Sequence, residues 1–388
     1  MKNIISYLFI LFLLNILVVN CLSQQTIKPE SEKIYSLKKL RELYSSGNSG
    51  LWPKPNLHDE AKATFQEIGH LPEIIYPTDN PYSKEKELLG KTLFFDPRLS
   101  KSKQIACASC HDPELAWTDN RTVSFGHDRQ TGARNAMTIL NSAHISKPFW
   151  DGRAESLEAQ AQMPIQDPKE MNEHIDIAVE TIANIKGYEK LFAQAFGNKE
   201  VTKEKIGKAI ATFERGIKSG STKFDMFIDG KSDALSDDEL MGLHLFRTKA
   251  QCINCHNSGY FSNNEFINDG TGLLGSKQQD LGLYIITKNP DDAGKFRVPT
   301  LREVTRTGPW MHNGAFTPLR DVLTFYNAGN PEPKSKSSTV YEGVALSSKK
   351  SNMLKPLNLT NKELDQLEAF LGTLSSRTRR IILPELPK

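Results

Sequence analysis

The chain has 388 residues, of which 24% are charged, and its net charge of +3 gives no indication of a nucleic-acid partner. The length is sufficient for two domains with buried cores of their own. After the apolar run that ends at Val19, no hydrophobic stretch is long enough to span a bilayer.

The start of the chain has the pattern of an export signal. A basic residue is followed by an apolar run that ends at Val19, which is typical of a signal peptide over residues 1–23. Cleavage after Ser23 is one interpretation. A lipoprotein with a lipid anchor on Cys21 is another, and it is favoured because a free thiol is otherwise unusual in an exported protein. An uncleaved membrane anchor is a third. Each interpretation places the folded part outside the cytoplasm, in the periplasm.

Helical periodicity dominates the rest of the chain. Residues 24–60 are a polar N-terminal extension, in which leucines at helical spacing predict a short helix over 36–44. Loops are expected from about residue 112 to 150 and over 258–298, and strand patterns are scarce. Further helices are predicted over 84–93, 154–163, 174–185, 201–219, 237–247 and 361–375. The sequence therefore predicts a mainly α fold.

Two of these helices have a clear apolar face. In the helix over 201–219 the face consists of Ile206, Ala209, Ile210 and Phe213. In the last helix, which begins at a cap on Thr360 or Asn361, the residues expected to be buried are Leu364, Leu367, Phe370 and Leu371.

The motif C-x-x-C-H occurs twice, about one domain length apart. The two copies are Cys107, Cys110 and His111, and Cys252, Cys255 and His256. Two thiols at this spacing can each add to one vinyl group of a haem, and the adjacent imidazole can bind the iron. The alternative is a zinc site made of the four cysteines, which would need neither histidine. The repeated histidine favours two c-type haems, in a pair of mainly helical cytochrome-c-like domains.

The sixth position on each iron decides between electron transfer and catalysis. His127 lies in a glycine-flanked loop after the first motif, and such a loop could carry a ligand on and off an iron; a surface histidine is the alternative. His312, in an aromatic turn, is a candidate for contact with a haem edge. The remaining histidines are expected to be structural or exposed, and they are His58, His70, His144, His174 and His244.

Further sequence blocks occur in a fixed order between about residues 50 and 377. They are 89–100, 134–135, 149–153, 158–160, 170–171, 296–302 and 311–314. Together with the two haem motifs, they resemble the bacterial di-haem cytochrome c peroxidases and their close relatives. The resemblance implies an N-terminal peroxidatic haem domain, here 61–230, and a C-terminal electron-transfer haem domain, here 231–388.

The resemblance also implies roles for individual residues. His127 matches a removable sixth ligand on the first haem, and Trp150 matches a tryptophan between the haems. Asn135, with the backbone carbonyls of Thr307 and Pro309, matches a calcium site, and a carboxamide with two carbonyls suits that hard cation.

Gln160 and Glu170 match the pair on the peroxide-binding side of the first haem. Cleavage of the peroxide O–O bond requires a proton to move from the inner to the outer oxygen, and a carboxylate can carry it. Glu170 is therefore the better catalytic candidate, because Gln160 can position the oxygen but cannot accept the proton.

One position departs from the peroxidase pattern. Where the family places a methionine on the second haem, this chain has Tyr326, as in relatives that oxidise tryptophans of a partner protein. Those relatives lack the loop histidine that His127 matches here. Met311 is the alternative ligand of the second iron, and a phenolate from Tyr326 would lower the potential relative to a thioether.

These features predict a periplasmic peroxidase that reduces hydrogen peroxide with electrons from a small cytochrome c or a cupredoxin. One alternative is a di-haem oxidase of a protein or organic substrate. Another is an electron-carrier cytochrome without catalysis, which would not need Gln160 and Glu170 beside a releasable ligand. A homodimer is compatible with the sequence.

Overall fold

The computed structural model describes residues 35–332, 339–347, 349–377 and 380–388. The predicted signal peptide over 1–23 and the predicted lipidation of Cys21 lie outside the described residues. Within the described ranges, no helix combines the length and the apolar character needed to cross a membrane.

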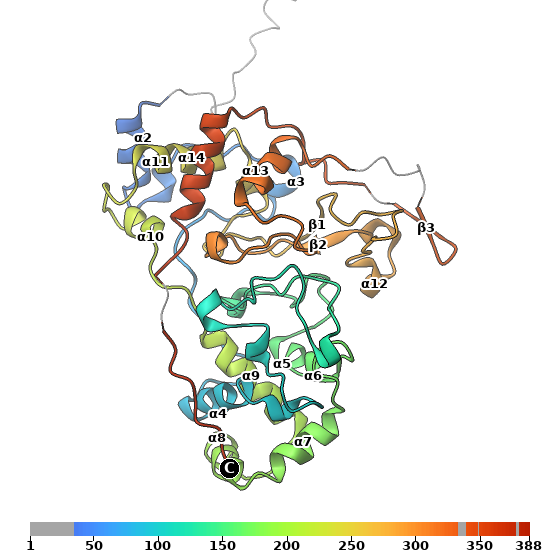
Figure 1. The fold of residues 1–388 in the computed structure, drawn as a ribbon. Helices are drawn as coiled ribbons and strands as arrows, with labels where there is room; N and C mark the ends of the chain where they lie inside the picture. The colour runs from blue at the N-terminus through green and yellow to red at the C-terminus, as the bar shows by residue number, and fades with distance from the viewer. Residues whose placement is uncertain (1–34, 333–338, 348, 378–379) are drawn as a thin grey trace, which may run out of the picture. The chain divides into compact units, whose positions relative to one another are not determined.

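The described chain is mainly helical, as predicted (Figure 1). Its α-helices are α2 (Leu37–Tyr44), α3 (Asp59–Lys62), α4 (Lys84–Phe94), α5 (Leu157–Gln160), α6 (Met163–Gln166), α7 (Ile175–Ala183), α8 (Lys186–Phe196), α9 (Lys203–Gly216), α10 (Lys223–Ile228), α11 (Asp237–Arg247), α12 (Tyr284–Thr287), α13 (Leu319–Asn327) and α14 (Asn361–Gly372). The strands β1 (Phe266–Asn268) and β2 (Lys295–Arg297) form one antiparallel pair, and β3 (Thr339–Tyr341) and β4 (Val344–Leu346) form another.

One group of helices packs around α9. Helices α4, α5 and α7 contact α9, and α8 packs on α4 and α7. At the crossing of α4 and α9, a Cβ on Gly90 would lie 1.9 Å from the carbonyl oxygen of Ala209, so glycine permits the close approach of the two backbones. The predicted apolar face of α9 is confirmed, since Ile206, Ala209, Ile210 and Phe213 are all buried.

A second group of helices packs around the pair α11 and α14. A Cβ on Gly242 of α11 would lie 1.9 Å from the carbonyl oxygen of Gln366, so this crossing also depends on a glycine. Each helix begins with a capping box, at Ser236 and at Thr360, which satisfies backbone N–H groups of the first turn. The residues predicted to be buried on α14 are buried, and they are Leu364, Leu367, Phe370 and Leu371.

The polar extension joins this second group from residue 37 onward. Helix α2 packs on α11, where Arg41 pairs with Asp237 at 2.7 Å. The hydroxyl of Tyr44 lies 3.0 Å from Nδ1 of His244, and its ring packs edge-to-face on Trp52. The described part of the extension therefore contributes to the second apolar core.

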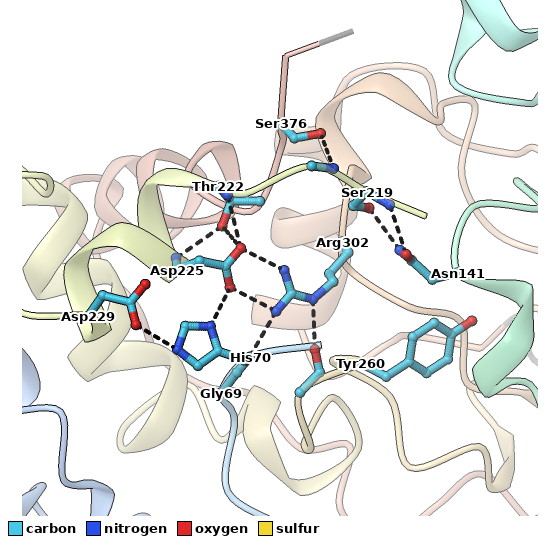
Figure 2. A network of polar contacts seen from close by, with 12 residues as sticks. Gly69, His70, Asn141, Ser219, Thr222, Asp225, Asp229, Tyr260, Arg302 and Ser376 are labelled. Carbon is cyan, nitrogen blue, oxygen red and sulfur yellow. Dashed lines mark hydrogen bonds and ion pairs between the residues drawn. The ribbon is translucent and has the colours of Figure 1, made fainter. Parts of the chain in front are cut away.

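A polar network surrounds the segment that leads from α9 to α10 (Figure 2). The buried guanidinium of Arg302 pairs with Asp225 of α10 at 3.1 Å and donates to the carbonyl of Gly69 at 2.8 Å. The backbone N–H of Ser219 donates to the side chain of Asn141 at 2.9 Å. The network connects segments that are far apart in the sequence, so it fixes where the chain passes from one helix group to the other.

Several elements differ from the sequence-based expectation. Of the helix expected over 154–163 only α5 forms, and a separate short helix, α6, begins at Met163 with Pro164 in its first turn, where proline is tolerated. Helices α8 and α10 were not predicted; α8 contains Gly187 in its first turn, and α10 is short. The segment 258–298, expected to be a loop, contains the small β1–β2 ladder.

Candidate haem sites and the residues around them

The first C-x-x-C-H motif forms a tight turn over Cys107–Ser109. The backbone N–H of His111 donates to the carbonyl of Cys107 at 3.1 Å. The ring Nδ1 of His111 donates to the carbonyl of Trp117 at 3.1 Å, and this bond leaves Nε2 unprotonated. Burial lowers the pKa of His111, so the imidazole is held in the neutral form that a metal requires.

The second motif repeats this arrangement. The backbone N–H of His256 donates to the carbonyl of Cys252 at 3.0 Å, and Nδ1 donates to the carbonyl of Phe261 at 3.2 Å. Burial lowers the pKa of His256 to about 4. Trp117 and Phe261, which supply the accepting carbonyls in the two motifs, both have a positive φ. The two motifs are therefore locally equivalent.

These arrangements fit covalently bound haem. All four motif cysteines are free rather than paired in disulfides. In the described part of the chain, no three side chains of His, Cys, Asp or Glu gather where they could hold a metal ion, so the four-cysteine zinc site is not formed. Each motif combines two free thiols with one neutral, oriented imidazole, which is the set that c-type haem attachment needs.

The loop that carries His127 docks on the segment that contains Glu170. The backbone N–H of His127 donates to the carbonyl of Glu170 at 2.8 Å, and a Cβ on Gly126 would lie 1.9 Å from the carbonyl oxygen of Lys169. The side chain of His127 is mostly buried, and its Nδ1 has no hydrogen-bond partner in the described residues. The imidazole therefore has one nitrogen without a partner among the described residues, while its Nε2 lies 3.3 Å from the carboxylate of Asp128, and glycine at position 126 permits the close packing of the two segments.

Glu170 lies close to the first motif. Its charge acts on the thiols of both Cys107 and Cys110, whose pKa values are raised mainly by burial. Burial is also the main cause that raises the pKa of Glu170, and the nearby carboxylate of Asp167 adds to it. A carboxyl group in this setting can exchange a proton more readily near neutral pH than an exposed glutamate can.

Gln160 lies at the end of α5, which is anchored to α9. The anchor is the pair of Glu158 on α5 and Arg215 on α9, with the atoms 2.5 Å apart. Among the described residues, no side-chain hydrogen bond joins Gln160 to Glu170. The structure therefore brings His127 and Glu170 together through a backbone hydrogen bond, whereas the position of Gln160 beside the first motif stays a prediction.

Glu214 is a functional candidate that the sequence analysis missed. It is buried on α9, its Oε2 has no hydrogen-bond partner among the described residues, and its charge acts on the thiol of Cys107. Burial raises the pKa of Glu214 to about 8. A signal was present, because Glu214 follows Ile210 by four residues and so shares the apolar face of α9.

The second motif opens into a cavity lined by Cys252, Cys255 and His256. Tyr326 of α13 and Met311 both line this cavity, so the structure brings both predicted ligands of the second iron to one place. Burial raises the pKa of Tyr326 well above its ordinary value of 10, and the nearby carboxyl of Asp269 and the two thiols add to this effect.

Trp150 lines the same cavity and is nine-tenths buried. Its indole N–H donates to the backbone carbonyl of Asn135 at 3.0 Å, and its ring packs edge-to-face on His312. Asn135, Thr307 and Pro309, which form the predicted calcium site, also line the cavity. His312 stacks on Phe296 with ring centroids 3.6 Å apart, so it lies at the cavity wall.

Known proteins resemble this chain over most of its length. A sequence profile described as di-haem cytochrome c peroxidase matches residues 84–233. The methylamine utilization protein MauG of Methylorubrum extorquens is 37% identical over 327 residues, which are 84% of this chain and 87% of that protein. Cytochrome c551 peroxidase of Nitrosomonas europaea is 40% identical over 244 residues, 63% of this chain and 73% of that protein. The crystal structure of a MauG-like protein associated with microbial copper homeostasis is 33% identical, with a TM-score of 0.70 over 79% of this chain and 95% of that one. The chain therefore belongs to the di-haem cytochrome c peroxidase family.

Proposed function

We propose that this protein reduces hydrogen peroxide to water, with electrons from a small cytochrome c or a cupredoxin. Each peroxide takes up two electrons and two protons and gives two water molecules. The observation that carries the proposal is the pair of equivalent C-x-x-C-H motifs, of which the first has the partly buried carboxyl of Glu170 beside it. Each motif would hold one c-type haem, in cytochrome-c-like domains over about 61–230 and 231–388.

The first haem is the proposed peroxide site. Cys107 and Cys110 would form the thioether bonds, and His111 would bind the iron through Nε2. His127 would be the releasable ligand, and the backbone hydrogen bond from its N–H to Glu170 is one contact that its loop would have to give up. Peroxide access would then depend on the position of this loop.

Glu170 is the proposed proton carrier. When bound, haem iron supplies the electrons for breaking the O–O bond. Glu170 would accept the proton from the inner peroxide oxygen and deliver it to the outer one, so that water leaves. Gln160 would hold the peroxide by hydrogen bonding, since its amide cannot exchange a proton in this way.

The second haem is the proposed point of electron entry. Cys252 and Cys255 would form its thioether bonds, His256 would be one ligand, and Tyr326 or Met311 the other. Trp150 would carry electrons towards the first haem, because its indole borders the cavity of the second motif. A calcium ion bound by Asn135 and the carbonyls of Thr307 and Pro309 would order this region.

The proposed enzyme would work in the periplasm, after removal of residues 1–23 or with a lipid on Cys21, and the proposed covalent haem attachment and the apolar run that ends at Val19 support this location. The cysteines of the two haem motifs would then form thioether bonds to the haems, so that these motifs expose no reactive thiol to the oxidising compartment.

Steady-state peroxide turnover by protein that carries both haems tests the function. Reduced cytochrome c is the donor, and a Cys107→Ala, Cys110→Ala variant that retains only the second haem is the control. We expect peroxide-dependent oxidation of the donor by the two-haem protein, and none by the control. Fast electron exchange with the donor but no peroxide dependence in both proteins would make this chain an electron carrier.

A second candidate function is oxidation of a protein or organic substrate. The specific observation in its favour is Tyr326, which stands where the peroxidase pattern has methionine. Incubation of the peroxide-treated protein with a tryptophan-containing peptide, followed by mass measurement of the peptide, would detect this activity as a gain of oxygen or a loss of hydrogen.

A further inference from the structure

Arg297, on β2, is a buried cation without an acidic partner. Its side chain is 1% exposed. Its Nε donates to the backbone carbonyl of Phe149 at 3.3 Å, and its Nη2 lies 2.9 Å from the sulfur of Met137. Its Nη1 has no hydrogen-bond partner, and no carboxylate lies within ion-pair distance of it in the part of the chain that the structure describes.

The other fully buried arginines are neutralised by the protein. Arg302 pairs with Asp225 (Figure 2), and Arg247 pairs with Glu67. The phenol of Tyr260 interacts with the guanidinium of Arg297, but burial raises the pKa of Tyr260, so this group remains neutral and supplies no negative charge. An unpaired guanidinium in a low-dielectric interior is strongly unfavourable unless an anion compensates it. Arg297 therefore points to an anion that the polypeptide does not provide.

The position of Arg297 identifies that anion. Arg297 lines the same cavity as Cys252, Cys255 and His256. A haem fixed to these cysteines through its vinyl groups carries two propionate carboxylates on the opposite edge of the porphyrin. Arginine is suited to bind a carboxylate, because its planar guanidinium matches the two oxygens.

We propose that Arg297 binds a propionate of the second haem and neutralises it inside the cavity. The backbone N–H of Arg297 donates to the carbonyl of Trp150 at 2.8 Å, and β2 is paired with β1 through Phe266. The salt bridge between Arg297 and the propionate would therefore hold the haem edge at a fixed position relative to Trp150. Arg297 is a positioning residue in this proposal, which rests on the proposed haem attachment but not on peroxidase activity.

The midpoint potential of the second haem tests the proposal. Without the guanidinium, an uncompensated propionate favours the ferric state, so Arg297→Gln should lower the potential of the second haem and leave that of the first unchanged. The propionate should then also titrate more readily, so that the potential of the variant falls as the pH rises from 5 to 8 more steeply than in the wild type. Arg297→Lys, which keeps the charge, should restore most of the wild-type value.

Other ionisable side chains line this cavity, and they are Tyr260, Asp269, His312, Tyr326 and Lys355. They are present in the wild type and in every variant, so only the difference between variants is attributed to the propionate. Arg320→Gln on α13 is the matched control. It removes the same charge from a partly exposed arginine that pairs with Asp365 and Glu368, and should leave both potentials unchanged.

Mass measurement of the denatured proteins separates the two possible failures. Absence of the second haem from the wild type would contradict the proposed function. Two haems in Arg297→Gln with the wild-type potential and pH dependence would overturn the role of Arg297. If the glutamine variant does not mature, resonance Raman of Arg297→Lys decides, because the propionate bending band of the second haem should shift. An unchanged band would overturn the proposal.

Discussion

Replacement of Glu214 by glutamine should change how the stability of the protein depends on pH. Burial raises the pKa of Glu214 to about 8, whereas an unfolded glutamate titrates near 4.5. Between these values the unfolded chain has released a proton that the folded protein retains. The stability contributed by the protonated side chain is therefore fully present below pH 4.5 and is lost as the pH rises through 8.

The size of the effect follows from the two pKa values. One pKa unit corresponds to about 1.4 kcal/mol, so a change from about pH 5 to about pH 8 should cost the wild type about 3 kcal/mol relative to the Glu214→Gln variant. The glutamine cannot titrate, and it keeps the shape of the side chain. The charged form of Glu214 is unfavourable because its Oε2 has no hydrogen-bond partner in the described residues.

Urea unfolding of the haem-loaded proteins, followed by far-UV circular dichroism at pH 5 and pH 8, measures this difference. Glu204→Gln is the control, because Glu204 lies on the first turn of the same helix and is exposed. Hydrogen bonds to its own backbone and to Thr202 lower the pKa of Glu204. The Glu204→Gln variant should therefore not become more stable relative to the wild type as the pH rises from 5 to 8. If wild type and Glu214→Gln lose stability in parallel between pH 5 and pH 8, Glu214 does not titrate in this range and the reasoning is refuted.

Four further predictions concern the haem sites and the polar network. Glu170→Gln should keep both haem spectra and lose roughly 10²–10⁴-fold in peroxide turnover, and wild-type turnover should fall on the acid side at a pH above the ordinary 4.5 of glutamate, because burial raises the pKa of Glu170. His127→Gly should give a five-coordinate first haem in resonance Raman spectra of the oxidised protein; retained six-coordination with nitrogen would assign the gate to another residue. Tyr326→Met should raise the potential of the second haem alone in a redox titration and add a thioether absorption band, whereas a band already present in the wild type would favour Met311. Asp225→Asn should lower the free energy of unfolding by about 3–5 kcal/mol, measured by urea unfolding, because it leaves the buried guanidinium without its carboxylate.

The sequence determined the local features of this protein. The capped start of α14 and the apolar face of α9 depend on residues within a few positions of each other. Short-range periodicity and capping are properties of the chain itself, so these predictions are confirmed. The sequence blocks likewise identified the family, because this resemblance depends only on the order of the blocks along the chain and on their spacing.

The tertiary structure decided what lies beside each motif. The charge state of Glu214 and the missing counter-ion of Arg297 follow from burial among segments distant in the sequence, and neither can be read from spacing. The close crossing at Gly90 and the docking of the His127 loop on Glu170 are also contacts between distant segments. Local sequence patterns specify the helices and the motifs for covalent chemistry. The pKa values of buried groups and the need for a counter-ion depend on burial, and burial depends on which distant segments pack together and exclude water.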